Sequence, residues 1–158
     1  MDPTGTLHWD LDAIASALRI TREDSIRYFT DGRRVSFIIE RRLAAEVVHG
    51  TLALSEGAGY DVLDPDGGKW EVRSLTTGGV YFCPSYMVGS GRSFAEAGFL
   101  QKLDEIKGYI LADVTLFPDV PFWIVPVAAV RNWHVSRQLG SCSKINRLRA
   151  LQLIRGIE

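Results

Sequence analysis

Apolar and polar positions alternate along two neighbouring segments of the chain, between residues 60 and 74. One set of alternate positions is apolar or aromatic and consists of Tyr60, Val62, Trp70 and Val72. The segments are joined by Pro65-Asp66-Gly67, a tight-turn sequence, because proline presets φ, aspartate bonds its own backbone and glycine accepts a positive φ. A three-residue loop with a left-handed Gly67 would put Asp61 opposite Glu71. The pattern predicts a β-hairpin with one face in the core.

The other set of alternate positions in this hairpin is charged and consists of Asp61, Lys69, Glu71 and Arg73. Opposed carboxylates at Asp61 and Glu71 repel each other unless a cation lies between them. Carboxylate oxygens are also the ligands that Mg²⁺ prefers. Asp64 is a rival for Asp61, because a one-residue slip of the register would exchange the two. A solvated hairpin with cross-strand ion pairs is the alternative to a metal site.

A longer helix is predicted before the hairpin, from about Val35 to Val48. Its apolar stripe consists of Phe37, Leu43, Ala44, Val47 and Val48. Glu40 lies in the middle of that stripe and is therefore aimed at the core. Burying an unpaired carboxylate is costly, so Glu40 needs a partner or a metal ion. An arginine would be the structural partner, but the nearby Arg34, Arg41 and Arg42 project away from the stripe.

Two short helices are predicted towards the N-terminus. Asp10 caps a helix that reaches Leu18, and Thr21 begins a second helix that ends near Phe29. The spacing is that of a helix-turn-helix, which would read DNA. Short helix pairs are more often plain packing units, so both interpretations stay open.

Further strands and helices are predicted after the hairpin. The strands are Val80–Cys83, Tyr109–Val114 and Phe122–Val127. Pro126 favours an edge position for the last of them. One helix begins at a capping box of Ser93 and Glu96 and ends at Gly108, and an amphipathic helix covers Lys144–Ile154.

Length and composition limit the class of protein. The chain has 158 residues, of which 46% are hydrophobic, enough for one domain with a real core. No apolar run approaches membrane-spanning length and the first residues do not resemble a secretion signal, so we expect a cytoplasmic protein that contacts no membrane. Cys83 and Cys142 form no CxxC pair, and the three histidines lack zinc-site spacing. We expect neither zinc nor a disulfide.

The charge is −1 overall but unevenly distributed. Basic residues exceed acidic ones after Val130, which hints at a phosphate-containing partner. The Gly- and Ser-rich loop before Ser93 would bring backbone N–H groups and Arg92 to the start of a helix, a favourable place for an anion. The candidate nucleic-acid-binding residues from these two regions are Ser85, Arg92, Ser93, Arg131, Arg137 and Lys144. A flexible connector and a solvated amphipathic helix are the respective alternatives.

The charged face of the hairpin, Asp61-x(9)-Glu71-x-Arg73, resembles the catalytic core of the PD-(D/E)XK, or restriction-endonuclease-like, nuclease superfamily. The chain departs from that family at Arg73, where lysine is usual. The resemblance implies an α/β fold with an αβββαβ core, a mixed central sheet flanked by helices. The single domain would then consist of a helical N-terminal extension (1–34), the core (35–127) and a basic C-terminal helix region (128–158).

The activity that the resemblance implies is metal-dependent hydrolysis of DNA phosphodiester bonds by an endonuclease, either restriction-enzyme-like or specific for a junction or other DNA structure. The Asp61 and Glu71 carboxylates and the Val72 carbonyl would hold Mg²⁺, for which Mn²⁺ could substitute. Glu40 matches the helix carboxylate that often lies beside this site in the family. Arg73 stays protonated, so it can orient a phosphate but cannot activate water.

Two lysines are candidates to replace the missing amine: Lys69 on the hairpin and Lys102 on the following helix. A homodimer is expected, because one small site per chain would have to cut two strands. The alternative is a non-catalytic DNA-binding module, in which the N-terminal helix pair or the basic C-terminal region binds DNA and the nuclease-like core is a scaffold. A protein-interaction domain with only solvated hairpin charges would bind no metal.

Overall fold

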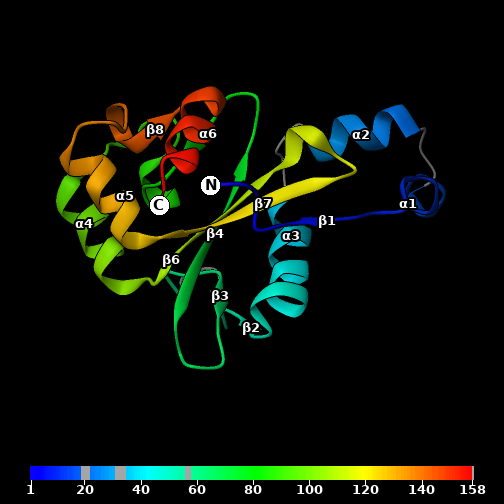
Figure 1. The fold of residues 1–158 in the computed structure, drawn as a ribbon, viewed down its shortest axis with the longest axis horizontal. Helices are drawn as coiled ribbons and strands as arrows, with labels where there is room; N and C mark the ends of the chain where they lie inside the picture. Colours follow the sequence, from blue (N-terminus) through cyan, green and yellow to red (C-terminus); the bar gives the residue numbers. More distant parts are fainter. Residues whose placement is uncertain (19–21, 31–34, 56–57, 158) are drawn as a thin grey trace.

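A mixed six-stranded sheet runs through the middle of the protein, with helices on both sides of it (Figure 1). The computed structural model describes residues 1–18, 22–30, 35–55 and 58–157. The strand order is β1-β7-β6-β4-β3-β2. These strands are β1 (Gly5–Leu7), β2 (Thr51–Leu52), β3 (Val62–Leu63), β4 (Lys69–Leu75), β6 (Gly108–Asp113) and β7 (Val120–Pro126). A separate antiparallel pair is formed by β5 (Val80–Tyr81) and β8 (Lys144–Ile145).

The helices divide between the two faces of the sheet. The α-helices are α1 (Leu11–Leu18), α2 (Arg22–Thr30), α3 (Ser36–Leu43), α4 (Glu96–Glu105), α5 (Val127–Val135) and α6 (Arg147–Arg155). Short helical turns are η1 (Ala44–Val48), η2 (Ser85–Met87), η3 (Val114–Leu116) and η4 (Ser141–Ser143). Helices α1 to α3 pack on one face, and α4 to α6 pack on the other together with the two-stranded sheet (Figure 1).

Strand β6 separates two apolar cores. All six of its residues are buried, as expected for a strand covered on both faces. Tyr109 and Leu111 belong to the core under α4, α5 and α6, whereas Ile110 and Ala112 belong to the core under α1, α2 and α3. Alternate side chains of a strand point to opposite faces, so one short segment supplies both cores.

The predicted hairpin register is confirmed. Leu63 pairs with Lys69, and Gly67 has a φ of +82°. The regular pairing ends one residue earlier than predicted, because the Asp61 N–H donates to the Trp70 carbonyl at 2.9 Å. Asp61 therefore does not form a ladder pair with Glu71. The alternative of a solvated charged face does not hold at Glu71, which is buried and contacts Lys102 of α4.

The αβββ order arises from different strands than predicted. The three antiparallel strands after α3 are β2, β3 and β4, and α4 then crosses over to β6, which runs parallel to β4. The predicted third strand, β5, lies outside the main sheet. Strand β2 has only two residues, too few to produce a sequence pattern.

Several predicted element boundaries are wrong. The last strand is not an edge strand, because β1 pairs with the first half of β7, and Pro126 lies at the end that β1 does not reach. The helix after the loop begins at Glu96 with Ala95 as N-cap, so Ser93 forms no capping box. Helix α5 was not predicted, and Lys144 lies in β8 rather than in the last helix.

The N-terminal helices agree with the prediction in extent. The Asp10 carboxylate accepts a hydrogen bond from the Ala13 N–H at 2.9 Å, as expected of an N-cap. Thr21 and Arg34 lie outside the described residues. Among the helices that are described, none has both the length and the apolar character needed to cross a bilayer.

The turn before β5 generates a stability prediction. A Cβ at Gly79 would lie 1.9 Å from the Ile145 carbonyl oxygen, and the φ of Gly79 is +97°. Replacing Gly79 with alanine should lower the free energy of unfolding by at least about 2 kcal/mol in urea denaturation, because backbone must move and φ is strained. Gly78→Ala is the matched control, since its Cβ would meet only Thr76 Oγ1 at 3.6 Å. Equal stability of the two variants would contradict the packing of β5 on β8.

Candidate functional site

Three adjoining pockets form a groove along the hairpin, between α3 on one side and α4 on the other. The central pocket has a volume of about 430 Å³ and includes Asp61, Glu71 and Arg73 in its lining. A second pocket of about 750 Å³ extends towards α3 and shares Asp61 with the central one. A third of about 350 Å³ extends towards β5 and shares Arg73. Ser85 lines all three, so the pockets adjoin one another.

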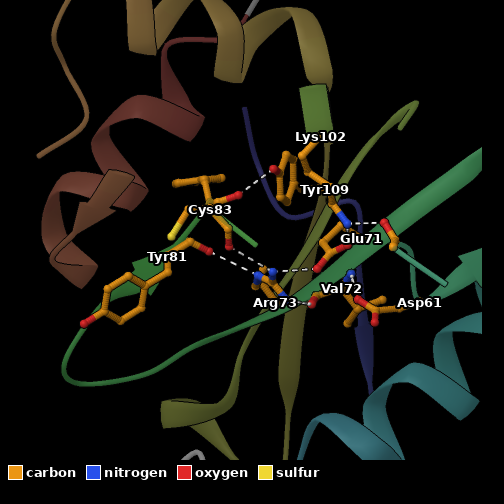
Figure 2. A network of polar contacts seen from close by, with 10 residues as sticks. Asp61, Glu71, Val72, Arg73, Tyr81, Cys83, Lys102 and Tyr109 are labelled. Carbon is orange, nitrogen blue, oxygen red and sulfur yellow. Dashed lines mark hydrogen bonds and ion pairs between the residues drawn. The ribbon is translucent and has the colours of Figure 1, made fainter. Parts of the chain in front are cut away.

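Glu71 is the most buried carboxylate of this groove, with 5% of the residue exposed. It lies on β4, on the face covered by α4. One carboxylate oxygen contacts Lys102 Nζ from α4, and the other lies 2.5 Å from Arg73 Nη2 (Figure 2). Two cations therefore offset the cost of burying one carboxylate. Lys102 is equally buried and also donates to the Gly59 carbonyl.

Arg73 is held by backbone carbonyls as well as by Glu71. Its guanidinium donates to the carbonyls of Tyr81 and Cys83, at 3.2 Å each, and more weakly to that of Val72 at 3.4 Å (Figure 2). Guanidinium has several donors in a rigid fork, which suits this set of acceptors. Arg73 therefore ties the segment after β5 to the groove, a structural role that the sequence did not indicate.

Asp61 has a different environment from Glu71. Its Oδ2 accepts a hydrogen bond from the Val72 N–H at 2.8 Å, and within the described residues no hydrogen bond reaches Oδ1. Burial and the charge of Glu71 raise the pKa of Asp61 to about 6, although the Val72 N–H and the cations Arg73 and Lys102 act in the opposite direction. The hydrogen bond and the two cations thus offset only part of the cost of burying a negative charge at Asp61.

Glu40 reaches the same groove from α3. It is half-buried and lines the second pocket. Burial and the charge of Asp61 raise its pKa to about 7, Glu71 adds to the rise, and Ser36 and Arg41 oppose it. Arg41 therefore offsets only part of the cost of burying the Glu40 carboxylate. Glu40 of α3, Asp61 just before β3 and Glu71 of β4 interact electrostatically.

Two of the hairpin candidates lie elsewhere. Lys69 is exposed, with its Nζ 5.4 Å from the Tyr60 ring centroid, and it does not line the groove. Asp64 organises the hairpin turn: it accepts from the Trp70 indole N–H and Lys107 Nζ, at 2.9 Å each. These bonds lower the pKa of Asp64 to about 2. Asp64 therefore bonds to the turn and to Lys107 rather than facing the groove, and the register does not slip by one residue to exchange it with Asp61.

The predicted nucleic-acid-binding residues are mostly dispersed. Arg92 donates to the loop carbonyls of Ser85 and Val88, at 3.0 and 3.1 Å, and Ser93 precedes the start of α4. Helix α4 begins at Glu96 with Ala95 as N-cap, so Ser93 is not the residue that caps it. Arg131 pairs with Asp104 at 2.6 Å.

At the C-terminal end, only one of the predicted basic residues joins the groove. Arg137 is exposed just after α5. Lys144 lines the third pocket, with its Nζ 5.0 Å from the Tyr81 ring centroid. Of the three basic residues predicted from this region, Arg131, Arg137 and Lys144, it is Lys144 that lines a pocket of the groove.

Sequence reasoning missed the aromatic side chains of the groove. Tyr60 and Tyr86 line the central pocket, and Tyr28 lines the second. Tyr86 is 64% exposed and Tyr28 is 45% exposed. A tyrosine in a Gly- and Ser-rich loop, remote from any periodic segment, was the one available signal.

The side chains at the hairpin fit a hard cation only in part. Asp61, Glu71 and the Val72 carbonyl supply oxygen ligands of the kind that Mg²⁺ binds. Within the ranges that the structure describes, however, no three Asp, Glu, His or Cys side chains are arranged to hold a metal ion. Both oxygens of Glu71 contact cations of the protein. A metal ion at Glu71 would therefore compete with Lys102 and Arg73 for the carboxylate oxygens.

The raised pKa values generate a prediction for stability against pH. Asp61 and Glu40 keep their protons to higher pH in the folded state than in the unfolded chain. The folded state therefore binds more protons between about pH 4 and pH 7, and it loses stability as the pH rises through that window. Asp61→Asn and Glu40→Gln should each raise the thermal midpoint by a few degrees at pH 8 and by much less at pH 4.5.

Asp66→Asn, on the exposed hairpin turn, is the control for this experiment. This variant should change the thermal midpoint by the same small amount at pH 8 and at pH 4.5. A Glu40→Gln or Asp61→Asn variant that is less stable than the wild-type protein at pH 8 would show that these carboxylates are well compensated in the folded state.

Comparison of the chain with protein-family models, with curated proteins and with solved structures finds no significant match.

Proposed function

We propose that the protein is a metal-dependent endonuclease that hydrolyses phosphodiester bonds of DNA. The observation that carries this proposal is the meeting of Glu40, Asp61 and Glu71 in one groove, with Lys102 against Glu71. Carboxylates whose pKa values are raised by burial and by neighbouring carboxylates, as those of Glu40 and Asp61 are, cluster at functional sites. Their grouping is costly to the fold, which favours a functional reason for it.

The topology is compatible with the proposal. The main sheet is built in the order α3, β2, β3, β4, α4 and β6, with β5 of the two-stranded sheet between β4 and α4. This order supports the proposal, because the resemblance implies an αβββαβ core with an acidic hairpin among its strands. Fold alone does not imply function, so the proposal depends on the groove.

Asp61, Glu71 and the Val72 carbonyl would hold the metal ion, with Glu40 beside them. A bound Mg²⁺ supplies Lewis-acid stabilisation of charge on the scissile phosphate and a more acidic water. Asp61 is held in place by the Val72 N–H at 2.8 Å, which leaves its second oxygen available for a ligand. Glu40, whose pKa is raised to about 7, can take up or release a proton near neutral pH.

Lys102 is the best candidate for the amine that Arg73 does not provide. Arg73 is engaged by carbonyls and cannot lose its proton, whereas the Lys102 ammonium ends beside Glu71 at the central pocket. Released from Glu71, this ammonium could stabilise negative charge on a phosphate. Lys69, exposed on the hairpin, is not needed in this scheme.

A second function is favoured by the same ion pairs. Because Lys102 and Arg73 together neutralise Glu71, the hairpin can be stable without a metal ion. The protein would then be a non-catalytic DNA-binding module that uses this fold as a scaffold. The two functions differ in whether the groove takes up a divalent cation. For the catalytic function, a homodimer would supply one site for each strand.

Cleavage assays test the first function. Supercoiled, linear, single-stranded and branched DNA should be incubated with Mg²⁺, with Mn²⁺ and with EDTA. At least one substrate should be cut only when Mg²⁺ or Mn²⁺ is present. Asp61→Asn should slow cleavage by at least about 100-fold, because it alters a metal ligand, and even residues that only support a metal ligand typically change activity by about 10- to 100-fold. Asp66→Asn should stay near the wild-type rate. Metal-independent cleavage, or equal rates for the two variants, would refute the proposal.

Isothermal titration with Mg²⁺ and Mn²⁺ separates the two functions. The endonuclease should bind a divalent cation, and Lys102→Met should strengthen that binding, because one competitor for Glu71 is removed. Asp61→Asn should weaken it. A protein that binds DNA in a salt-dependent manner but takes up no cation would be the scaffold module instead.

A further inference from the structure

The central pocket has an aromatic wall that the hydrolysis of a phosphodiester does not itself require. Tyr86 is part of η2 and is 64% exposed, yet its neighbour Met87 is buried and anchors the turn. The phenol lies across α4 at Gly98: a Cβ there would meet Tyr86 Oη at 2.9 Å and Met87 Cε at 2.6 Å. Glycine is unfavourable inside a helix, so its presence here makes room for these two side chains. Tyr86 is therefore an exposed ring whose hydroxyl lies against Gly98 of α4.

The charges of the groove differ from one end to the other. The central pocket is lined by three carboxylates, Asp61, Glu71 and Glu105, and by two cations, Arg73 and Lys102. The third pocket shares Arg73, adds Lys144 and has no carboxylate in its lining. A phosphate is thus favoured in the third pocket over the central one.

The two cations of the third pocket support the same placement of a phosphate. Arg73 lines both the central and the third pocket, and Lys144 lines the third, with its Nζ 5.0 Å from the Tyr81 ring centroid. Lysine and arginine side chains are common partners of backbone phosphates in nucleic-acid complexes. The third pocket can therefore position a backbone phosphate next to the central pocket.

We propose that the central pocket receives an unpaired base stacked on Tyr86, with an adjoining phosphate in the third pocket at Lys144. The inference rests on the proposed function and names its substrate class: single-stranded or locally unpaired nucleic acid. In a duplex both faces of each base are covered by its neighbours, so no face is available to Tyr86 unless the base leaves the stack. A volume of about 430 Å³ lies within the range of pockets for small ligands.

Fluorescence anisotropy with the full chain tests this inference. The probes are a fluorescein-labelled 12-nucleotide single strand and the same sequence in a duplex. Both are measured with Ca²⁺ in place of Mg²⁺, so that binding is observed apart from cleavage. The single strand should bind more tightly. Tyr86→Ala should weaken its binding by about 10-fold, as for the loss of one stacked base, and leave duplex binding unchanged. Tyr86→Phe keeps the ring and should bind as the wild-type protein does.

Lys144→Gln tests the phosphate end of the same site. It should weaken single-strand binding and reduce the slope of log K against log salt by about 0.7, the value for one phosphate contact on a single strand. The thermal midpoint of Tyr86→Ala should stay at the wild-type value, because this side chain is mostly exposed. A shifted thermal midpoint in Tyr86→Ala, together with an equal loss of single-strand binding in Tyr86→Phe, would indicate a structural role for Tyr86 and overturn the inference.

The outcomes distinguish this inference from the proposed function. Duplex binding as tight as single-strand binding, no nucleic-acid binding at all, or an unchanged affinity in Tyr86→Ala would each overturn the stacking site, even if DNA is cleaved. Binding that depends on Tyr86 without cleavage of any substrate in Mg²⁺ would support the stacking site and refute the nuclease.

Discussion

The buried ion pair between Glu71 and Lys102 is the contact on which the groove depends. It joins the central strand β4 to the crossover helix α4, and Arg73 extends it to the carbonyls that follow β5. Removing one member of a buried pair typically costs about 3 to 5 kcal/mol, because the other charge is left without compensation. The position of α4, and with it the wall of the central pocket, is therefore coupled to the charge on one carboxylate.

Three of the carboxylates that line this groove differ in their environments. Glu71 is neutralised by two cations, Asp61 is held by one backbone N–H, and Glu40 is half-buried with a pKa raised to about 7. Such differences in environment are what separate ligands from proton carriers in hydrolytic sites. The groove thus contains the chemical variety that a metal-dependent hydrolase needs, and it also contains the cations that would compete with the metal.

The parts that could be predicted from the sequence depend on local chemistry. Pro65-Asp66-Gly67 determines its own loop geometry, and that loop sets the register of β3 on β4. Glu40 was conspicuous as a charge on an apolar stripe. The contacts of Arg73 and the place of β5 could not be predicted, because they depend on which distant strand, β8, pairs with Val80 and Tyr81. Two-residue strands carry too little pattern to reveal such pairing.

The parallel pairing of β4 with β6 also has a consequence for how the site is assembled during folding. Glu71 and Lys102 are separated by 31 residues, and they meet only after the crossover through α4 has closed. Long-range closure of this kind is slow compared with formation of the hairpin. Before that step the hairpin holds Glu71 with Arg73 alone, since Lys102 has not yet arrived, and the geometry of the groove forms together with the core.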